Sequence, residues 1–248
     1  MRFGRVNVEK NILLKHPATI LVSGATGSGK STFIHRLLEN STELFTPQPS
    51  LPIQVMWVYG AEQNFTRMNN NFVKVNYTDE LPETYDGIDI LVLDDQQNSL
   101  SGSKELGDIY TKFSHHKKMT VIFVVQNIFN KGSQMRNISL NTHYLVLTKN
   151  RRDLMQIKTL STQLYGNSSS FFMDAYKRAV LKPDFGYLLI DLTPTTEEKY
   201  RLRTRIFPGE YTIVYQPNVK SSKGMHSDLG NLLKNERRDK EEEIFTFV

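Results

Sequence analysis

The run GATGSGKS at residues 24–31 constrains the fold of this 248-residue chain more than any other feature. It meets the pattern G-x-x-x-x-G-K-[ST] in full. The apolar segment 18–22 before it is typical of a short buried strand, and residues 31–39 after it carry apolar side chains at helical spacing. A strand, this pattern and a helix in that order predict a phosphate-binding loop and disfavour a chance glycine-rich turn.

The chemistry of such a loop follows from its residue types. Glycines let the backbone wrap tightly, so that successive N–H groups point at phosphate oxygens, and the positive N-terminal end of the next helix adds to the attraction. Lys30 is expected to reach the β- and γ-phosphates of ATP, and the Ser31 hydroxyl to bind Mg²⁺. The expected nucleotide-binding residues are Gly24, Ala25, Thr26, Gly27, Ser28, Gly29, Lys30, Ser31 and Thr32.

Two acids, Asp94 and Asp95, follow the apolar segment 88–93. On a buried strand we expect Asp94 to emerge beside the phosphate loop and hold Mg²⁺ through water, and Asp95 to orient or deprotonate an attacking water. The alternative is a strand that runs into an acidic turn. Because the acids follow a complete phosphate loop, the catalytic interpretation is favoured, and a paired acid favours hydrolysis over transfer to a small acceptor.

Gln126 closes another continuous apolar strand, predicted at residues 120–125. If this strand lies between the strands of the loop and of the acid pair, the Gln126 amide can touch both the γ-phosphate and the lytic water. A polar residue at a strand end is common, so it is the order of loop, acid pair and glutamine that gives Gln126 its predicted catalytic role.

Strand-like and helix-like segments alternate, which predicts an α/β fold: a three-layer P-loop NTPase fold (RecA/ASCE-like) with a central, mostly parallel sheet and extra C-terminal strands. Besides the segments above, we expect strands at 53–59, 73–77, 144–148, 187–191 and 211–215, and helices at 106–113, 153–165 and 170–180. Residues 1–217 are expected to form the ATPase domain and 218–248 a polar, charged tail.

Composition excludes several other classes of protein. There are no cysteines, hence no disulfide framework or thiolate metal site, and the six histidines show no metal-ligand spacing. The longest apolar runs are strand-sized, and the N-terminus lacks the apolar core of a secretory signal. We therefore expect no membrane partner and a protein kept inside the cell. A net charge of +5 leans weakly toward a polyanionic partner.

These motifs, with several longer stretches, resemble the FtsK–HerA superfamily of DNA-pumping ATPases. The likeness is strongest to the genome-packaging ATPases of Polinton-type elements, adintoviruses, virophages and large DNA viruses. It spans about residues 15–215, and the later stretches are more specific than the phosphate loop. The matching stretches are residues 23–32, 93–95, 114–127, 135–144, 149–153, 186–192 and 203–210.

The resemblance implies a ring of identical subunits, usually a hexamer, that threads double-stranded DNA through its centre by hydrolysing ATP. It matches Lys30 and Ser31 to the nucleotide and Mg²⁺ positions, Asp94 to the metal-side acid, Asp95 to the catalytic acid and Gln126 to the polar sensor. Many members of the superfamily have Asp-Glu where this chain has Asp-Asp. The packaging branch often carries Asp-Asp. Capsid proteins are further expected partners, and the host nucleus, the cytoplasm or the virion the expected location.

Rings of this kind complete each site with an arginine from the next subunit, worth about 10³ or more in rate where tested. The candidates are Arg136, Arg151 and Arg152, of which we favour Arg152. The alternative is that Arg152 caps the helix beginning at Asp153 or pairs with an acid.

DNA contacts are expected mainly at phosphates, because a motor must grip every sequence alike. Two polar loops, 97–104 and 130–136, are the candidate pore loops, with Lys131 and Arg136 as contacts.

Two alternative functions remain: a P-loop kinase or other phosphotransferase, and a nucleotide-binding scaffold without translocation. A kinase would be expected to have an Arg-rich lid and an acceptor pocket, and the intact Lys30, Asp94 and Asp95 disfavour a scaffold.

Overall fold

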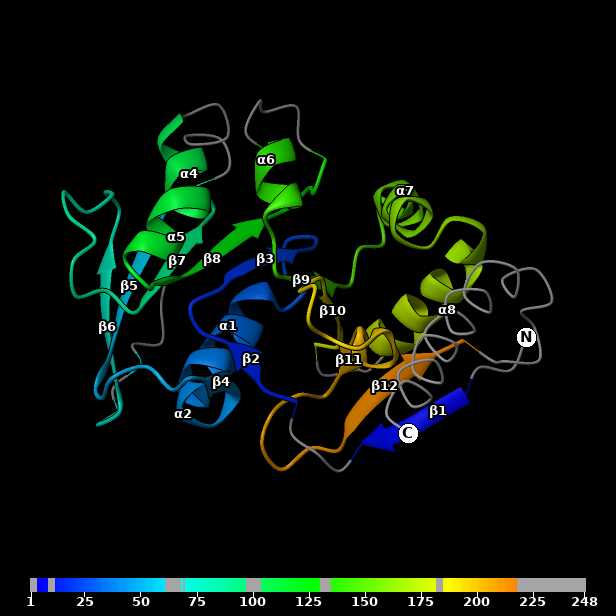
Figure 1. The fold of residues 1–248 in the computed structure, drawn as a ribbon. Helices are drawn as coiled ribbons and strands as arrows, with labels where there is room; N and C mark the ends of the chain where they lie inside the picture. The colour runs from blue at the N-terminus through cyan, green and yellow to red at the C-terminus, as the bar shows by residue number, and fades with distance from the viewer. Residues whose placement is uncertain are drawn as a thin grey trace, which may run out of the picture.

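A computed structural model of the chain describes residues 4–8, 12–60, 68, 70–96, 104–129, 135–181 and 185–217, with the backbone alone for 4–8. A large sheet runs through the molecule with helices on both of its faces (Figure 1). Its strands are β1 (Gly4–Val8), β3 (Thr19–Ser23), β5 (Ile53–Tyr59), β6 (Val73–Thr78), β7 (Ile90–Asp94), β8 (Thr120–Val125), β9 (Tyr144–Thr148), β10 (Tyr187–Asp191), β11 (Leu202–Thr204) and β12 (Thr212–Gln216).

Among the described residues, the remaining elements are helical apart from one short strand pair. The α-helices are α1 (Lys30–Glu39), α2 (Ser41–Leu44), α4 (Lys104–Asp108), α5 (Ser114–His116), α6 (Met135–Leu140), α7 (Leu154–Tyr165) and α8 (Ser169–Val180). A π-helical turn, η1 (Ile109–Phe113), joins α4 to α5, and the 3₁₀ turns are η2 (Gly166–Ser168) and η3 (Glu198–Tyr200). The short parallel pair is β2 (Leu14–Lys15) with β4 (Phe45–Thr46).

The strand order is β1-β12-β11-β10-β9-β3-β8-β7-β5-β6. Six neighbouring strands run parallel: β9, β3, β8, β7, β5 and β6. Beyond β9, the sheet continues in antiparallel pairs through β10, β11, β12 and β1. The predicted α/β class with a mostly parallel centre and added C-terminal strands is therefore confirmed.

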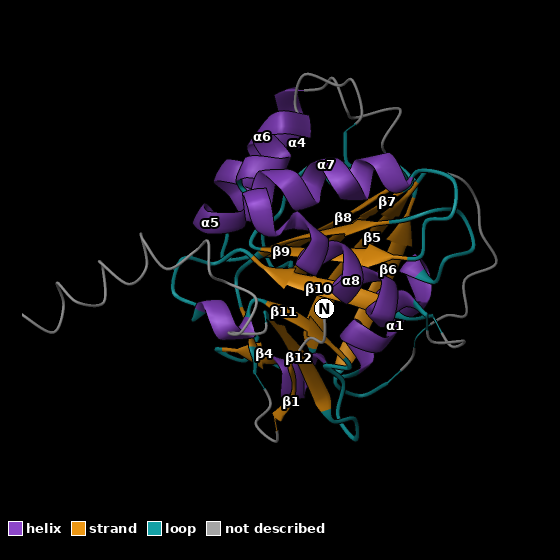
Figure 2. Ribbon diagram, turned by 90° about the vertical axis from the view of Figure 1, so that its right-hand side faces the viewer, coloured by secondary structure: helices purple, strands orange, loops and turns teal. Residues whose placement is uncertain are grey.

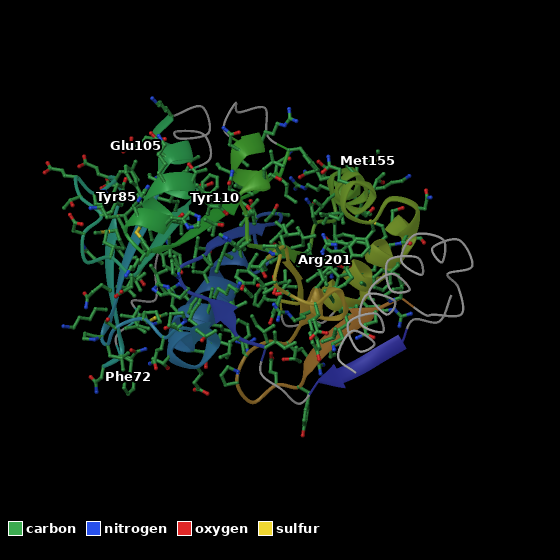
Figure 3. All side chains as sticks on the ribbon, viewed as in Figure 1. Phe72, Tyr85, Glu105, Tyr110, Met155 and Arg201 are labelled. Atoms are coloured by element: carbon green, nitrogen blue, oxygen red, sulfur yellow. The ribbon has the colours of Figure 1, made fainter. Side chains whose placement is uncertain are left out.

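Each face of the sheet buries its own apolar cluster, so the molecule has three layers (Figure 2). In β3, Ile20 and Val22 pack on the face covered by α1, whereas Leu21 packs on the face covered by α4, η1, α7 and α8. This alternation is the period of two expected of a strand. Tyr110 of η1, labelled in Figure 3, is buried in the apolar cluster on the face covered by α4, α7 and α8.

The order of the central strands fixes the position of the site. Strand β8 lies between β3 and β7, as the interpretation of Gln126 requires. Parallel strands end at the same edge of a sheet, so the phosphate loop after β3, the acids at the end of β7 and Gln126 after β8 all meet there. Ligands of open α/β sheets bind at this carboxyl edge.

The predicted strands 53–59, 120–125, 144–148 and 187–191 have these bounds in the structure, and the others differ by one or two residues. The elements β1, β2, β4, β11, α2 and α6 were not predicted from the sequence. Because Met135 and Arg136 begin α6, the second candidate pore loop is helical at its end, and Lys104 of the first begins α4. The rest of both loops, Lys131 included, and the tail 218–248 lie outside the described residues.

In the part of the chain that the structure describes, no helix has the length and apolar character needed to cross a membrane.

Candidate functional site

The phosphate loop leaves the buried strand β3 and enters α1 directly. Gly27 and Gly29 have positive φ angles of 70° and 93°, which glycine adopts without steric cost. Gly29 stands at the N-terminal cap of α1, so the first turn of the helix points its free N–H groups into the loop. Four apolar residues on one face of α1 anchor the helix to the sheet: Phe33, Ile34, Leu37 and Leu38.

Lys30 folds back onto its own loop. Its ammonium donates hydrogen bonds to the carbonyl oxygens of Gly24 at 2.9 Å and Ala25 at 3.1 Å. Burial lowers the pKa of Lys30, while Asp94 and Asp95 act to raise it. A partly buried cation beside two acids and held only by loop carbonyls can exchange those weak partners for phosphate oxygens.

Thr148, at the end of β9, supports the loop from the neighbouring strand. Its hydroxyl lies 2.6 Å from Ser28 Oγ and donates to the Ser23 carbonyl at 3.2 Å. A methyl group on Gly24 would overlap Thr148 Oγ1, so the loop needs glycine there to approach β9. Sequence reasoning missed Thr148, because a threonine that ends a strand carries no motif.

Asp94 is the last residue of β7 and is only 3% exposed. Its Oδ2 atom makes no hydrogen bond with any described residue. Burial raises the pKa of Asp94 and Asp95 adds to this shift, whereas Lys30 and the Trp57 indole act against it. A buried carboxylate oxygen that accepts no close hydrogen bond, beside a lysine and at a phosphate loop, fits a Mg²⁺ ion or one of its waters.

Asp95 leaves the strand in a strained conformation. Its φ angle is +55°, which is uncommon for any residue but glycine, and its side chain is exposed. Gly60, at the end of the neighbouring β5, donates its N–H to the Asp94 carbonyl at 3.0 Å, and a methyl group on Gly60 would overlap the Asp95 carbonyl. The end of β5 therefore makes room for the turn of the backbone at Asp95.

One cavity of about 250 Å³ joins the predicted residues at this edge of the sheet. Its lining includes backbone and side chains from the loop, from β7 and from the end of β8. The lining residues are Thr26, Gly27, Lys30, Ser31, Asp94, Asp95, Val124, Val125 and Gln126. The arrangement places a cation, two carboxylates, a hydroxyl and an amide around one space, which is the set of groups that phosphoryl transfer uses.

Arg152 lies outside that cavity, in the exposed turn between β9 and α7. Its N–H donates to Asn150 Oδ1 at 3.1 Å, and its guanidinium makes no hydrogen bond or ion pair with the described residues. The helix is capped instead by Asp153, whose carboxylate accepts from the Gln156 N–H at 3.2 Å. The capping alternative for Arg152 therefore does not hold. Arg151 and Arg136 are exposed as well.

The fold has three layers, a phosphate loop between β3 and α1, and two acids at the end of β7. These features define a fold of the P-loop NTPase type. No family model and no curated protein matches the chain. Among solved structures, it is similar to the genome packaging NTPase B204 from Sulfolobus turreted icosahedral virus 2, in complex with sulfate. The identity is 10% and the TM-score 0.48, over 83% of this chain and 99% of that chain. At these values the likeness assigns no function to this chain.

Proposed function

We propose that this chain is an ATP-driven translocase of double-stranded DNA, the motor subunit that packages a viral or virus-like genome. The observation that carries the hydrolytic part is the single cavity shared by Lys30, Ser31, Asp94, Asp95 and Gln126. The DNA part is supported by the sequence resemblance and by the net charge of +5. A ring, with six subunits as the expected number, follows from the same resemblance.

Each residue of the cavity would have its own role in hydrolysis. Bound ATP with Mg²⁺ would supply the reactive phosphoryl group and part of the charge neutralisation. Lys30 would exchange its loop carbonyls for the β- and γ-phosphates, and Ser31 with Asp94 would hold the metal side. Asp95 and Gln126 both line the cavity. Asp95 would accept a proton from an attacking water, and the Gln126 amide would orient that water.

ATP hydrolysis with and without long double-stranded DNA tests the proposal against its alternatives. A translocase should hydrolyse ATP faster when long DNA is present. A phosphotransferase should respond to a small acceptor and not to DNA, and a scaffold should bind ATP without turning it over. Unchanged hydrolysis with DNA of every length would overturn the DNA part of the proposal.

Two substitutions test the site itself. Lys30→Ala should lower hydrolysis by at least about 10²-fold, because it removes a charge aimed at the transferred phosphoryl group. Asp95→Asn should lower it by about 10²–10⁴-fold, because an amide cannot accept the proton, yet it should still bind ATP. The matched controls, Lys74→Ala and Asp79→Asn, change exposed residues of the same types on or next to β6. Parent-level hydrolysis by either site variant would refute the assignment.

A further inference from the structure

Phe185 covers the phosphate loop from a different element. It lies just before β10 and packs on Gly29, where an added methyl group would overlap the Phe185 ring. Nevertheless, 52% of this large apolar residue is exposed. An aromatic side chain that rests on a phosphate loop and is half open to solvent is an apolar surface available to a ligand bound in that loop.

The backbone at Phe185 is also strained. Its φ angle is +53°, a region that bulky side chains seldom adopt. Such a conformation persists only where the surroundings hold it, and outliers of this kind gather at ligand sites. Asp95, in the catalytic cavity, has the same kind of backbone, with a φ angle of +55°.

The course of a nucleotide through the loop leads toward Phe185. In the proposed function, the cavity that Lys30, Asp94 and Gln126 line would take the γ-phosphate end of the nucleotide. The nucleoside would then leave in the other direction, past the first turn of α1. Gly29 and Thr32 are three residues apart and share one side of that turn, and neither lines the cavity. Phe185, packed on Gly29, borders this exit.

We propose that the ring of Phe185 stacks on the base of the bound nucleotide. The inference rests on the proposed function, because it requires the phosphates to occupy the loop. Stacking on an aromatic ring uses the π-face that every base presents, so Phe185 contributes affinity for a nucleoside with little choice among bases. Thr32 and the loop hold the phosphates, and Phe185 holds the other end of the ligand.

Calorimetric binding of ADP and of inorganic tripolyphosphate tests the inference, since only ADP carries a base. Phe185→Ala should weaken ADP binding on the order of tenfold and leave tripolyphosphate binding unchanged. Phe185→Trp should retain ADP binding, and its fluorescence should be quenched by ADP and not by tripolyphosphate. The single native tryptophan, Trp57, is fully buried but interacts with Asp94, so the response of the parent protein to each probe is measured and subtracted.

Phe72→Ala is the matched control. Phe72 is 58% exposed and lies at the opposite, amino-terminal edge of the sheet, where its carbonyl accepts from the Ile53 N–H (Figure 3). This variant should bind both probes like the parent. Two results with Phe185→Ala would overturn the inference: unchanged ADP affinity, or equal losses for ADP and tripolyphosphate, since equal losses mean that Phe185 only shapes the loop. A parent protein that binds neither probe would overturn the proposed function and this inference together.

Discussion

At Asp94, the proposed function and the stability of the fold oppose each other. It is 3% exposed, and burial raises its pKa because the charged form loses its hydration. The folded state therefore holds a proton on Asp94 more readily than the unfolded state does. The contribution of Asp94 to the free energy of unfolding falls as the pH rises from about 4, the ordinary Asp value, through the raised pKa.

Asp94→Asn should consequently make the nucleotide-free protein more stable near pH 7. A gain of about 1 kcal/mol corresponds to about 2–4 °C in Tm for a chain of this size. The gain should vanish below about pH 4, where Asp94 of the parent is protonated too. Thermal melts across this pH range measure the effect, with Asp79→Asn as the exposed control. A lower Tm for Asp94→Asn at pH 7 would show that Lys30 outweighs the cost of burial.

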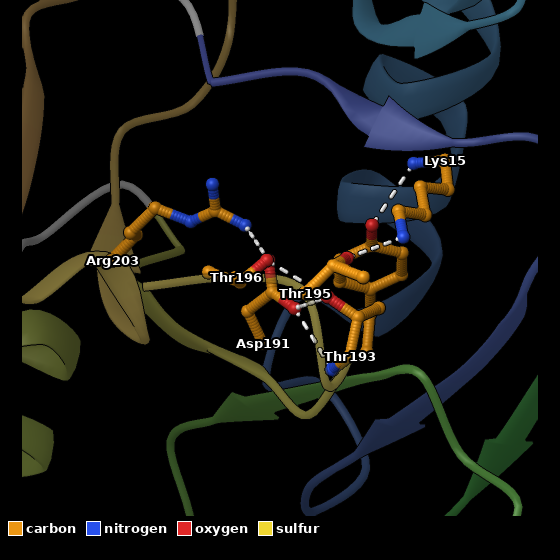
Figure 4. Close-up of polar contacts among 7 residues, drawn as sticks. Lys15, Asp191, Thr193, Thr195, Thr196 and Arg203 are labelled. Carbon is orange, nitrogen blue, oxygen red and sulfur yellow. Dashed lines mark hydrogen bonds and ion pairs between the residues drawn. The ribbon is translucent and has the colours of Figure 1, made fainter. Parts of the chain in front are cut away.

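At the scale of elements, the antiparallel strands depend on one buried ion pair. Arg203 of β11 is fully buried and donates to Asp191 of β10 at 2.7 Å (Figure 4). The Asp191 carboxylate also accepts hydrogen bonds from Thr193 and Thr196, which close the turn after β10. The Arg203 Nε and Nη1 atoms make no hydrogen bond with the described residues, and burial lowers the pKa of Arg203 while Asp191 opposes this shift.

Arg203→Met should destabilise the fold by about 3–5 kcal/mol, because it leaves Asp191 charged and buried without its partner. Adding Asp191→Asn to Arg203→Met should restore part of this loss, since the amide carries no charge. Denaturant unfolding of the two variants measures the difference. For comparison, Asp86→Asn breaks the exposed pair with Lys117 and should leave the unfolding midpoint almost unchanged. A double variant no more stable than the single one would contradict the role given to the unpaired charge.

At the scale of the whole molecule, Arg152 lies in an exposed turn after β9, at the same edge of the sheet as the phosphate loop. Arg152 comes four residues after Thr148, which contacts the phosphate loop, and its guanidinium has no partner among the described residues. The same exposed turn carries Arg151. This agrees with the proposed ring, in which a neighbouring subunit would receive the arginine.

A mixing experiment tests whether Arg152 acts between subunits. Arg152→Ala alone should retain ATP binding and lose hydrolysis by about 10³-fold. Mixing it with Lys30→Ala should restore part of the activity. The Arg152→Ala subunit keeps an intact phosphate loop, and the Lys30→Ala subunit supplies Arg152 to it. Arg151→Ala is the matched control and should hydrolyse ATP like the parent. If the mixture is as inactive as its two components, Arg152 does not act in trans.

Much of this site was predictable from local sequence. Three parts of the site come directly at the end of a run of apolar residues: the loop 24–31, Asp94 and Gln126. Such runs predict buried parallel strands, whose carboxyl ends lie at one edge of the sheet. A helix was predicted over 106–113 from its apolar spacing, whereas the helical segment of the structure spans 104–116 and contains a π-helical turn that the spacing did not predict. The short strands β2, β4 and β11 were not predicted, because two or three residues are too few to show the alternation of apolar and polar side chains that marks a strand.

The α/β class, the phosphate loop and the chemical types of the groups around it could be predicted from local patterns, since each depends on only a few neighbouring residues. Which distant groups meet became known only from the folded chain. Thr148 contacts Ser28, Gly60 makes room for Asp95, Phe185 covers Gly29 and Arg203 pairs with Asp191. Each of these contacts depends on the order of strands in the sheet, and long-range packing rather than local spacing sets that order.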